Sequence, residues 1–468
     1  MTIMLILLFP LFLAILNIVF KSGRLSKLTL LLHPVVLLTG LTYIYSGYDH
    51  RQLEYFAVDS TNILFLFLLG AIYLPVSFAS MVFFKKENIK EKEVVFYDLM
   101  MILFVFAMTG AILSTHLGMF WVFIELTTLA SAPLIYFEKR KGSLEATWKY
   151  VFICSVSIAL AFIGIIFFTL AGKNINSLFF ADLVSKADEL SPFWLKFAFP
   201  FILAGFGTKA GLAPMHAWLP DAHSEAPAPV SALLSGMLLN SAFLGIMRVD
   251  NVMTAAGLDS YSKPLLGLSG FLSIFVCAVY ILKVKNYKRM LAYSSIENMG
   301  IIAIGFSLGK GGIFAAMLHL AGHSFAKTAF FLTSGNIVVL YGTKLIENVK
   351  GILVKNPKVG WTWIVSFLMI TAIPPSPLFV SEFMIVFELI NEEKYFQAVI
   401  FFLCVTIIIF GMGKVVIKLC SGEPSEHSTG EDITFIDILP QVVLIIILII
   451  AGINMPDFFY ALIQGVKI

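Results

Sequence analysis

The chain has 468 residues, of which 59% are hydrophobic and only 13% are charged, and its mean hydropathy is +0.92. A water-soluble domain usually carries roughly a quarter charged residues, so this composition argues against a soluble protein. The formal net charge is only +3, and basic runs interleaved with aromatic residues are absent, which argues against nucleic-acid binding. We therefore expect an integral membrane protein.

Apolar windows of helical length follow one another along the whole chain. They fall near residues 2–20, 28–47, 60–84, 95–114, 117–138, 150–171, 194–215, 228–248, 264–282, 290–309, 312–341, 359–390, 396–419 and 437–462. Each is long enough to cross a hydrocarbon layer of about 30 Å as an α-helix. The windows predict an all-α integral membrane protein of about 14 transmembrane helices. The first window precedes Lys21, Arg24 and Lys27 instead of following them, so we expect a retained helix and not a signal peptide.

The basic residues are unevenly divided between the two sides that this helix order implies. Of the 32 lysines and arginines, 21 fall on one set of alternate loops, 9 on the other set with the C-terminal tail, and Lys209 and Lys327 lie inside apolar windows. Cytoplasmic loops of membrane proteins carry the excess of Lys and Arg. This division predicts a multi-pass protein of the prokaryotic cytoplasmic (inner) membrane with both termini outside the cytoplasm.

Two windows contain helix breakers. The window at 194–215 carries Gly205, Gly207, Gly211 and Pro214, and the window at 359–390 carries Pro374, Pro375 and Pro377. They lie five windows apart, an odd number, so a repeat of this period is inverted in the membrane, as in many transporters. We predict two inverted five-helix repeats, at residues 95–250 and 251–420, with an N-terminal three-helix flank at 1–94 and a C-terminal helix at 421–468.

Four cysteines lie far apart along the chain, and none forms a CxxC pair. They are Cys154, Cys277, Cys404 and Cys420. Zinc and iron–sulfur sites usually require closely spaced cysteines. We therefore expect no cofactor and no metal in this chain.

Four ionisable residues lie deep in apolar windows: Glu125, Lys209, Lys327 and Glu382. A charge at the bilayer centre costs about 2.5–3.5 kcal/mol on the translocon scale, so four such residues indicate a function. The plainer alternative is two buried ion pairs that fix helix packing. We favour a proton relay, because a buried lysine can hold or lose a proton near neutral pH, depending on the nearby carboxylates.

Histidines extend this pattern. His319 and His323 are four residues apart, and Lys327 follows after four more, so all three share one helix face. A histidine pair at this spacing can also bind a metal or haem, but no third ligand lies nearby on that face and Lys327 would repel a cation. We therefore assign His319 and His323 to the relay, since histidine changes charge near neutral pH.

The segment HAWLPDAHSEAPAPVS at residues 216–231 is polar and rich in proline. It contains His216, Asp221, His223 and Glu225 as possible proton-entry or coupling residues. Its prolines also suit a simple turn between two helices, and the histidines suit a capping role. The residues alone leave both interpretations open.

The stretch FGTKAGLAPMHAWLPDAHSEAPAPVSALLSG resembles the signature of antiporter-like proton-translocating membrane subunits. This family includes subunits of complex I, Mrp cation/proton antiporters and group 4 membrane-bound hydrogenases. Further stretches, KRMLAYSSIENMGII and HLAGHSFAKTAFFLTSGNI, are most similar to the F component of hydrogenase-4. The resemblance covers about residues 95–420.

The resemblance implies a role for each buried charge. Glu125 resembles the glutamate that pairs with the lysine of the first broken helix, here Lys209. Lys327 resembles the central relay residue, and Glu382 resembles the exit residue. One departure concerns Asn240, where some complex I relatives have a lysine. Since asparagine cannot titrate, the link between the two halves would need water or the histidines near Lys327.

The function that this family implies is proton translocation in a redox-driven complex of the hydrogenase-4 or formate-hydrogenlyase type. The partners expected are other membrane subunits and a peripheral redox module that carries [NiFe] and iron–sulfur centres. The chain itself is expected to perform no redox chemistry. The alternatives are a Na⁺ or K⁺/proton antiporter subunit of Mrp type, a membrane subunit of a complex I or inorganic-carbon uptake system, and a structural membrane anchor.

Overall fold

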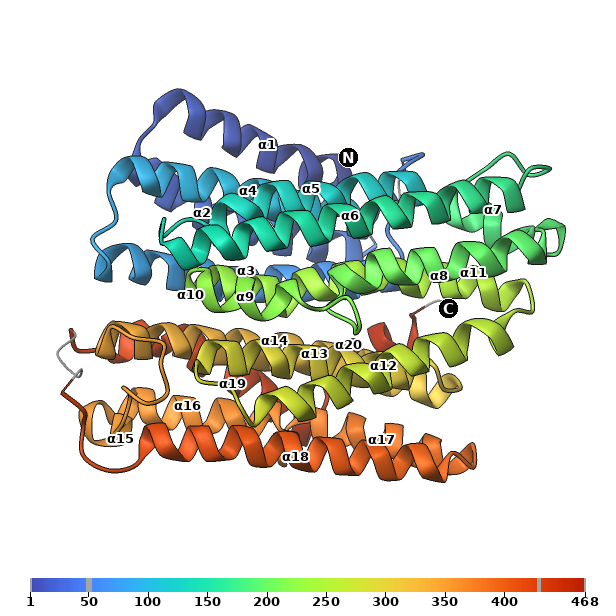
Figure 1. The fold of residues 1–468 in the computed structure, drawn as a ribbon. Coiled ribbons are helices and arrows are strands. Elements are labelled where there is room, and N and C mark those ends of the chain that lie inside the picture. The colour runs from blue at the N-terminus through green and yellow to red at the C-terminus, as the bar shows by residue number, and fades with distance from the viewer. Residues whose placement is uncertain (1, 48–52, 427–430, 467–468) are drawn as a thin grey trace.

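The computed structural model describes residues 2–47, 53–426 and 431–466. Arg51 and Lys467, two of the nine basic residues on the less basic side, lie outside the described residues. Within these ranges the chain is helical, with only four isolated β-bridges and no β-strand. Most helices run side by side along one direction (Figure 1). The predicted all-α membrane architecture is confirmed.

The helices of the N-terminal half follow the predicted windows closely. They are α1 (Thr2–Phe20), α2 (Gly23–Tyr45), α3 (Ser60–Lys86), α4 (Glu91–Leu113), α5 (Leu117–Ile135), α6 (Lys141–Ala171), α7 (Phe180–Ser185), the 3₁₀ turn η1 (Ala187–Glu189), α8 (Pro192–Lys209), α9 (Trp218–Glu225), α10 (Ala228–Leu233), the π-helical turn η2 (Leu234–Leu238) and α11 (Leu239–Ala255). The helix α6 begins nine residues before its apolar window, because its polar first turns extend past the apolar layer and are held by a Glu145–Lys149 pair at i,i+4 spacing.

The described residues of the C-terminal half form nine helices. They are α12 (Asp259–Ile281), α13 (Tyr287–Phe306), α14 (Lys310–Tyr341), α15 (Ile352–Lys355), α16 (Pro357–Ile370), α17 (Pro377–Asn391), α18 (Tyr395–Cys420), α19 (Phe435–Ile453) and α20 (Asp457–Gln464). The single helix predicted at 437–462 is wrong. Asn454 turns to an extended conformation, and Pro456 precedes α20, so the segment divides into α19 and α20.

Ten helical segments in the described residues are long and apolar enough to cross a membrane on length and composition alone. The other four predicted spans correspond to α8, to α13, to α14, and to α16 with α17. These segments are interrupted or carry buried polar residues, so length and composition alone do not identify them as membrane spans. The total of 14 stays a prediction, as do the boundaries of the two repeats.

Both predicted helix breaks are confirmed. The helix α8 ends at Lys209, and α9 begins only at Trp218. Gly211 lies between them with φ +77°, a conformation that glycine adopts without steric cost. The second break separates α16 from α17, which begins at Pro377 with a proline in its first turn.

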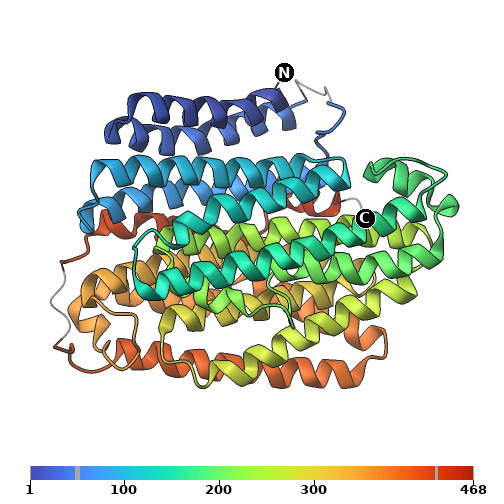
Figure 2. The same ribbon diagram turned by 45° about the horizontal axis from the view of Figure 1, so that its top comes forward.

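The helix α14 lies at the centre of the bundle. It packs against α3, α10, α13, α16, α17 and α19, and every residue from Ala315 to Ser334 is buried. The helices α1 and α2 form an outer layer (Figure 2), whereas α18 runs along another edge (Figure 1). Large apolar side chains on these outer helices are exposed, among them Phe12, Phe402 and Phe410. This arrangement suits a lipid-facing surface around an enclosed polar interior.

Candidate functional site

Lys209 is fully buried at the C-terminal end of α8, and its ammonium group forms a hydrogen bond to a neutral side chain. The Nζ atom donates a hydrogen bond of 2.9 Å to the hydroxyl of Tyr150 on α6 and lies 4.8 Å from the centre of that ring. The Tyr150 hydroxyl lies 2.7 Å from Ser131 Oγ on α5. A polar connection therefore joins α8, α6 and α5 at this depth.

Glu125 does not form the direct ion pair with Lys209 that the family resemblance implies. Its carboxylate accepts hydrogen bonds from Ser155 at 2.9 Å and from Thr128 at 3.2 Å. The Tyr150 hydroxyl occupies the position next to the ammonium group that a paired carboxylate would take. Glu125 still lies within electrostatic reach of Lys209, so the two charges interact through space.

Lys327 is fully buried in the middle of α14 and faces α13. Its ammonium group donates to the Leu291 carbonyl at 2.8 Å and to Ser294 Oγ at 2.7 Å. Glu297 lies one turn further along α13, close to Ser294 and within electrostatic reach of Lys327. Neither Lys209 nor Lys327 has a carboxylate within ion-pair distance in the described part of the chain. The two-ion-pair interpretation of these charges is therefore wrong.

His319 joins three helices. One of its ring nitrogens, Nδ1, lies 2.9 Å from Ser381 Oγ on α17, and the other, Nε2, lies 3.1 Å from Asn298 Oδ1 on α13. Glu382 follows Ser381 directly and is half-buried, with no hydrogen-bond or ion-pair partner among the described residues. The three residues Asn298, His319 and Ser381 thus extend the polar interior of the bundle towards Glu382.

His323 and His223 are buried imidazoles without hydrogen-bond partners in the described part of the chain. Both side chains are 0% exposed, and neither ring nitrogen of either residue has a hydrogen-bond partner among the described atoms. His323 lies within electrostatic reach of Lys327, His319 and His223. Buried polar groups of this kind are normally satisfied by internal water. The geometry therefore favours a hydrated interior around Lys327.

The polar segment after α8 is tied firmly to its surroundings. Asp221 pairs with Arg289 at 2.8 Å and with Lys149 at 3.1 Å, and Glu225 pairs with Lys344 at 3.3 Å. These contacts connect α9 to α13, α6 and the end of α14, so both carboxylates fix helix positions in this structure. His216 is only half-buried, and its Nδ1 lacks a partner.

Asn240 lies at the predicted link between the two halves of the bundle. Its side-chain amide donates to Ser324 Oγ at 2.6 Å and to the Gly236 carbonyl at 2.9 Å, and its Oδ1 lacks a partner among the described atoms. Ser324 is the neighbour of His323 on α14. The π-helical turn η2 precedes Asn240 directly, and such turns are frequent at functional sites.

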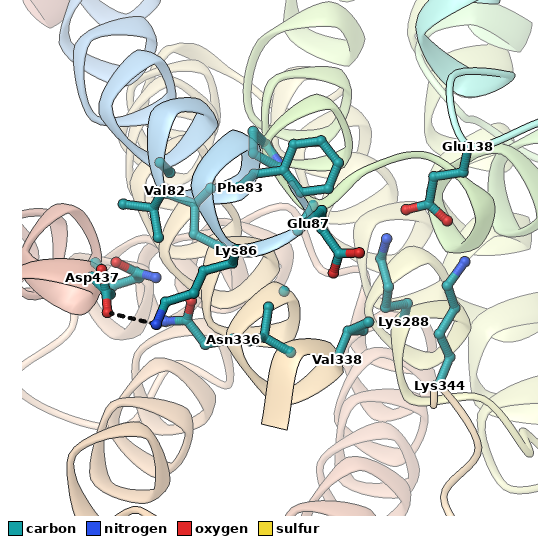
Figure 3. A pocket seen from close by; sticks show the side chains of 17 residues that line it. Val82, Phe83, Lys86, Glu87, Glu138, Lys288, Asn336, Val338, Lys344 and Asp437 are labelled. Carbon is teal, nitrogen blue, oxygen red and sulfur yellow. Dashed lines mark ion pairs between the residues drawn. The ribbon is translucent and has the colours of Figure 1, made fainter. Parts of the chain in front are cut away.

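A cavity of about 50 Å³ lies at the end of the bundle where the basic loops gather (Figure 3). Its lining includes Glu87, Glu138, Lys288 and Lys344, whose charged ends point towards one another. A volume of this size holds a few water molecules. Buried amide atoms without partners, Asn336 Nδ2 and Gln441 Oε1, belong to lining residues and are further groups that water can satisfy.

The sequence analysis does not identify several residues of the site. Glu297 lies in the stretch SSIENMGII, inside an apolar window. The criterion that selects Glu125, an ionisable residue deep in an apolar window, therefore also applies to Glu297. Tyr150, Ser294 and Ser381 carry no such signal, because hydroxyl side chains are common in membrane helices. Their importance comes from the atoms they contact, which only the three-dimensional arrangement reveals.

The chemical character of the site is that of protonatable side chains. Among the described residues, no group of three or more His, Cys, Asp or Glu side chains is placed to hold a metal ion. The four cysteines are buried and unpaired. The interior instead contains lysines, hydroxyls, imidazoles and carboxylates, which are groups that hold and transfer protons.

Two broken helices in a many-helix bundle, each close to a buried lysine or carboxylate, define the class of antiporter-like membrane subunits. Residues 114–408 match the model of the NADH:quinone oxidoreductase/Mrp antiporter, TM family. The chain belongs to this family, and it is a multi-pass membrane protein.

Comparisons with individual proteins agree. A hydrogenase-4 component F homolog from Methylacidiphilum infernorum is 34% identical over 390 residues, which cover 80% of this chain and 81% of that protein. The D subunit of a Na(+)/H(+) antiporter from Alkalihalophilus pseudofirmus is 28% identical over 81% of this chain and 77% of that protein. A chain of the archaeal membrane-bound sulfane sulfur reductase superposes with a TM-score of 0.88 at 21% identity, covering 99% of this chain and 96% of that one. The relatives are membrane subunits of multi-subunit complexes.

Proposed function

We propose that this chain is the proton-translocating subunit of a redox-driven membrane complex of the hydrogenase-4 or formate-hydrogenlyase type. The observation that carries the proposal is the pair of fully buried lysines, Lys209 and Lys327, each bonded only to neutral oxygen atoms. A buried ammonium group without a counter-ion is expensive, so a lysine in this position gives up a proton readily when its surroundings change.

The order of transfer follows the contacts. A change in the distance between Glu125 and Lys209 alters how strongly Lys209 holds its proton, because the two charges interact through space. The proton then passes through water and the partnerless His323 to Lys327, and the hydroxyls beside Asn240 border this step. From Lys327 the polar chain of Asn298, His319 and Ser381 leads towards Glu382.

The cavity at the basic end supplies the entry point. Lys288 lines it and donates a hydrogen bond of 2.5 Å to the Ala226 carbonyl, on the segment that carries His223. His223 lies within electrostatic reach of both Lys288 and Lys327. Water in the cavity and the imidazole of His223 therefore form a polar connection from this end of the bundle to Lys327.

The redox chemistry of the complex belongs to partner subunits in this proposal. A peripheral redox module carrying [NiFe] and iron–sulfur centres would drive the movement of Glu125 and Lys209. The excess of Lys and Arg on one set of loops supports a prokaryotic cytoplasmic membrane with the basic end on the cytoplasmic side and both termini on the other side. Similarity to a hydrogenase-4 component F homolog over most of the chain supports the choice of complex.

Affinity purification of the tagged chain in mild detergent, followed by mass spectrometry, tests the assignment to a complex. We expect to recover a [NiFe]-hydrogenase or formate-oxidising module together with other membrane subunits. Recovery of antiporter-like subunits alone would contradict this assignment. That result would favour the alternative function, cation/proton antiport of Mrp type.

The alternative rests on the similarity to the Na(+)/H(+) antiporter protein along most of both chains. The two functions differ in what drives the proton. In membrane vesicles with an imposed Na⁺ or K⁺ gradient and no redox substrate, an antiporter changes the internal pH. A redox-driven pump leaves the internal pH unchanged under these conditions. Lys209→Ala serves as the control in both assays, because it removes the ammonium group.

A further inference from the structure

Asp98 on α4 is a buried carboxylate that the proposed relay does not use. Its side chain is 0% exposed. One oxygen, Oδ2, accepts hydrogen bonds from Asn17 Nδ2 on α1 and from Thr29 Oγ1 on α2, the latter at 2.6 Å. Ser26 of α2 in turn donates to Asn17 Oδ1 at 3.1 Å. The cluster therefore joins the outer layer of α1 and α2 (Figure 2) to α4.

No positively charged side chain pairs with this carboxylate among the described residues. Asp98 forms no ion pair with a lysine, arginine or histidine in the part of the chain that the structure describes. Titratable groups within electrostatic reach of Asp98 are Tyr97 on its own helix and Tyr73 on α3, and His33 of α2 packs edge-on against Tyr73 at 5.2 Å between ring centres. Burying a charged carboxylate without a counter-ion is energetically costly. We therefore expect Asp98 to bind either a cation or a proton.

The hydrogen bonds decide between these two ligands. Among the described side-chain atoms of this cluster, Oδ1 of Asp98 is the one without a hydrogen-bond partner, so a proton placed there breaks none of the existing hydrogen bonds. A metal cation with oxygen ligands needs about six of them. A proton needs one.

We propose that Asp98 is a second proton-binding site, which carries its proton on Oδ1 in the resting protein and lies apart from the relay. The neutral acid keeps both hydrogen bonds to Oδ2 and removes the cost of a buried charge. The bound proton thereby holds α1 and α2 against α4.

Three further buried groups near Asp98 lack hydrogen-bond partners among the described atoms, and through water they can accept a hydrogen bond from the protonated carboxyl group. They are the hydroxyls of Tyr73 and Ser77 on α3 and Nδ1 of His33 on α2. Asp98 lies seven residues from the start of α4, about 10 Å along the helix, and His33 lies ten residues from the start of α2, about 15 Å. Asp98 and His33 therefore lie well inside the helices, and His33 lies near the middle of a layer about 30 Å thick.

The helix α3 lies between the groups around Asp98 and the proposed relay. Tyr73 lies close to Asp98, whereas the neighbouring Ile72 reaches the π-helical turn, where a Cβ on Gly236 would meet its Cδ1 at 3.6 Å. The proton site shares no residue with the proposed path through Lys209 and Lys327. Its existence does not depend on which complex contains the chain.

Infrared difference spectroscopy of the purified protein tests the proposal. The carbonyl stretch of a protonated carboxylic acid is resolved from that of a carboxylate. We expect the spectrum of the wild type at neutral pH, minus that of Asp98→Asn, to show one protonated-acid band. Thr29→Val should keep the band and move it to higher frequency, because the carbonyl oxygen Oδ2 loses a donor.

Two results would overturn the proposal. A difference spectrum without the acid band would show that Asp98 is ionised. A band that appears only when Na⁺ is replaced by a large organic cation would show that Asp98 binds sodium instead of a proton. Should Asp98→Asn not fold, the frequency shift in Thr29→Val alone decides, since a band unmoved by that change cannot come from Asp98.

Discussion

Lys209 and Lys327 share one feature, a buried ammonium group whose hydrogen bonds all go to neutral oxygens. Tyr150 serves Lys209, and the Leu291 carbonyl and Ser294 serve Lys327. Such bonds are worth about 1.5–3 kcal/mol each when one partner is charged. They therefore influence how tightly each lysine keeps its proton without fixing it as an ion pair would.

Tyr150→Phe tests this influence at a single atom. The change removes the hydroxyl that accepts from Lys209 and leaves the ring in place. Loss of about 1.5–3 kcal/mol corresponds to a roughly 10- to 100-fold change in the equilibrium between charged and neutral lysine. We expect proton translocation to fall at least about tenfold while the complex still assembles. Initial rates of acidification in inverted membrane vesicles measure the effect.

Tyr287→Phe is the matched control. Its hydroxyl is also a buried hydrogen-bond donor, at 2.9 Å from the Thr343 carbonyl, but it lies at the basic end of α13 and outside the relay. Equal losses in Tyr150→Phe and Tyr287→Phe would show that any missing buried hydroxyl weakens the protein, and the specific role of Tyr150 would be wrong.

At the scale of helices, α6 and α8 pack closely enough to need a glycine. A Cβ on Gly205 would come within 2.5 Å of Ala161 Cβ and 2.7 Å of the Ser157 carbonyl oxygen. Since a backbone atom cannot move aside easily, Gly205→Ala forces the helices apart. We expect a loss of about 1–3 kcal/mol in stability, observed as a lower thermal unfolding temperature in detergent.

Gly207→Ala provides the comparison on the same helix. A Cβ there has no neighbour closer than 3.8 Å. Alanine also favours a helix over glycine by about 1 kcal/mol, so stability should stay the same or rise. A similar loss in both variants would mean that close helix packing is not the reason for Gly205.

Arg248 of α11 secures the end of α4. Its guanidinium group donates to the carbonyls of Ile112 and Ser114, at 2.6 and 2.8 Å, and to Asn62 Oδ1 at 2.8 Å. Arg248→Met leaves these buried acceptors unpaired and should cost more than about 2 kcal/mol. Lys139→Met, which breaks an exposed pair with Glu93, should change stability by less than about 0.5 kcal/mol. Comparable unfolding temperatures for both variants would contradict the assigned role.

The sequence predicts helices best where hydropathy alone places them. The breaks after Lys209 and before Pro377 are also predictable, because glycine and proline clusters are rare inside apolar windows. The division of the last helix into α19 and α20 is missed, since Pro456 lies between segments that are both apolar. The early start of α6 is missed because a polar helical end has no apolar signal.

For the molecule as a whole, the sequence identifies the buried charges but not their partners. Lys209, Lys327 and the two histidines of α14 are found because ionisable residues stand out in apolar windows. The pairing of Glu125 with Lys209 cannot be judged that way, since Tyr150 comes from a third helix. The enclosed position of Asp98 likewise depends on how α1 and α2 pack against α4.

At one end of the bundle, charged side chains gather around a cavity. Lys86, Glu138, Lys288, Lys344 and Asp437 come from distant parts of the chain and line one cavity at the same end (Figure 3). Their gathering agrees with the alternation of loops on which the count of basic residues rests. The relay residues Lys209 and Lys327 do not line this cavity and are fully buried.

The most direct test of the central claim is the number of protons moved per electron in Lys327→Met. Inverted vesicles that contain the complete complex are supplied with its redox substrates, and acidification and electron transfer are measured together. We predict that electron transfer continues while acidification falls to the level of vesicles without the chain. Unchanged acidification per electron would show that protons cross elsewhere and would contradict the relay.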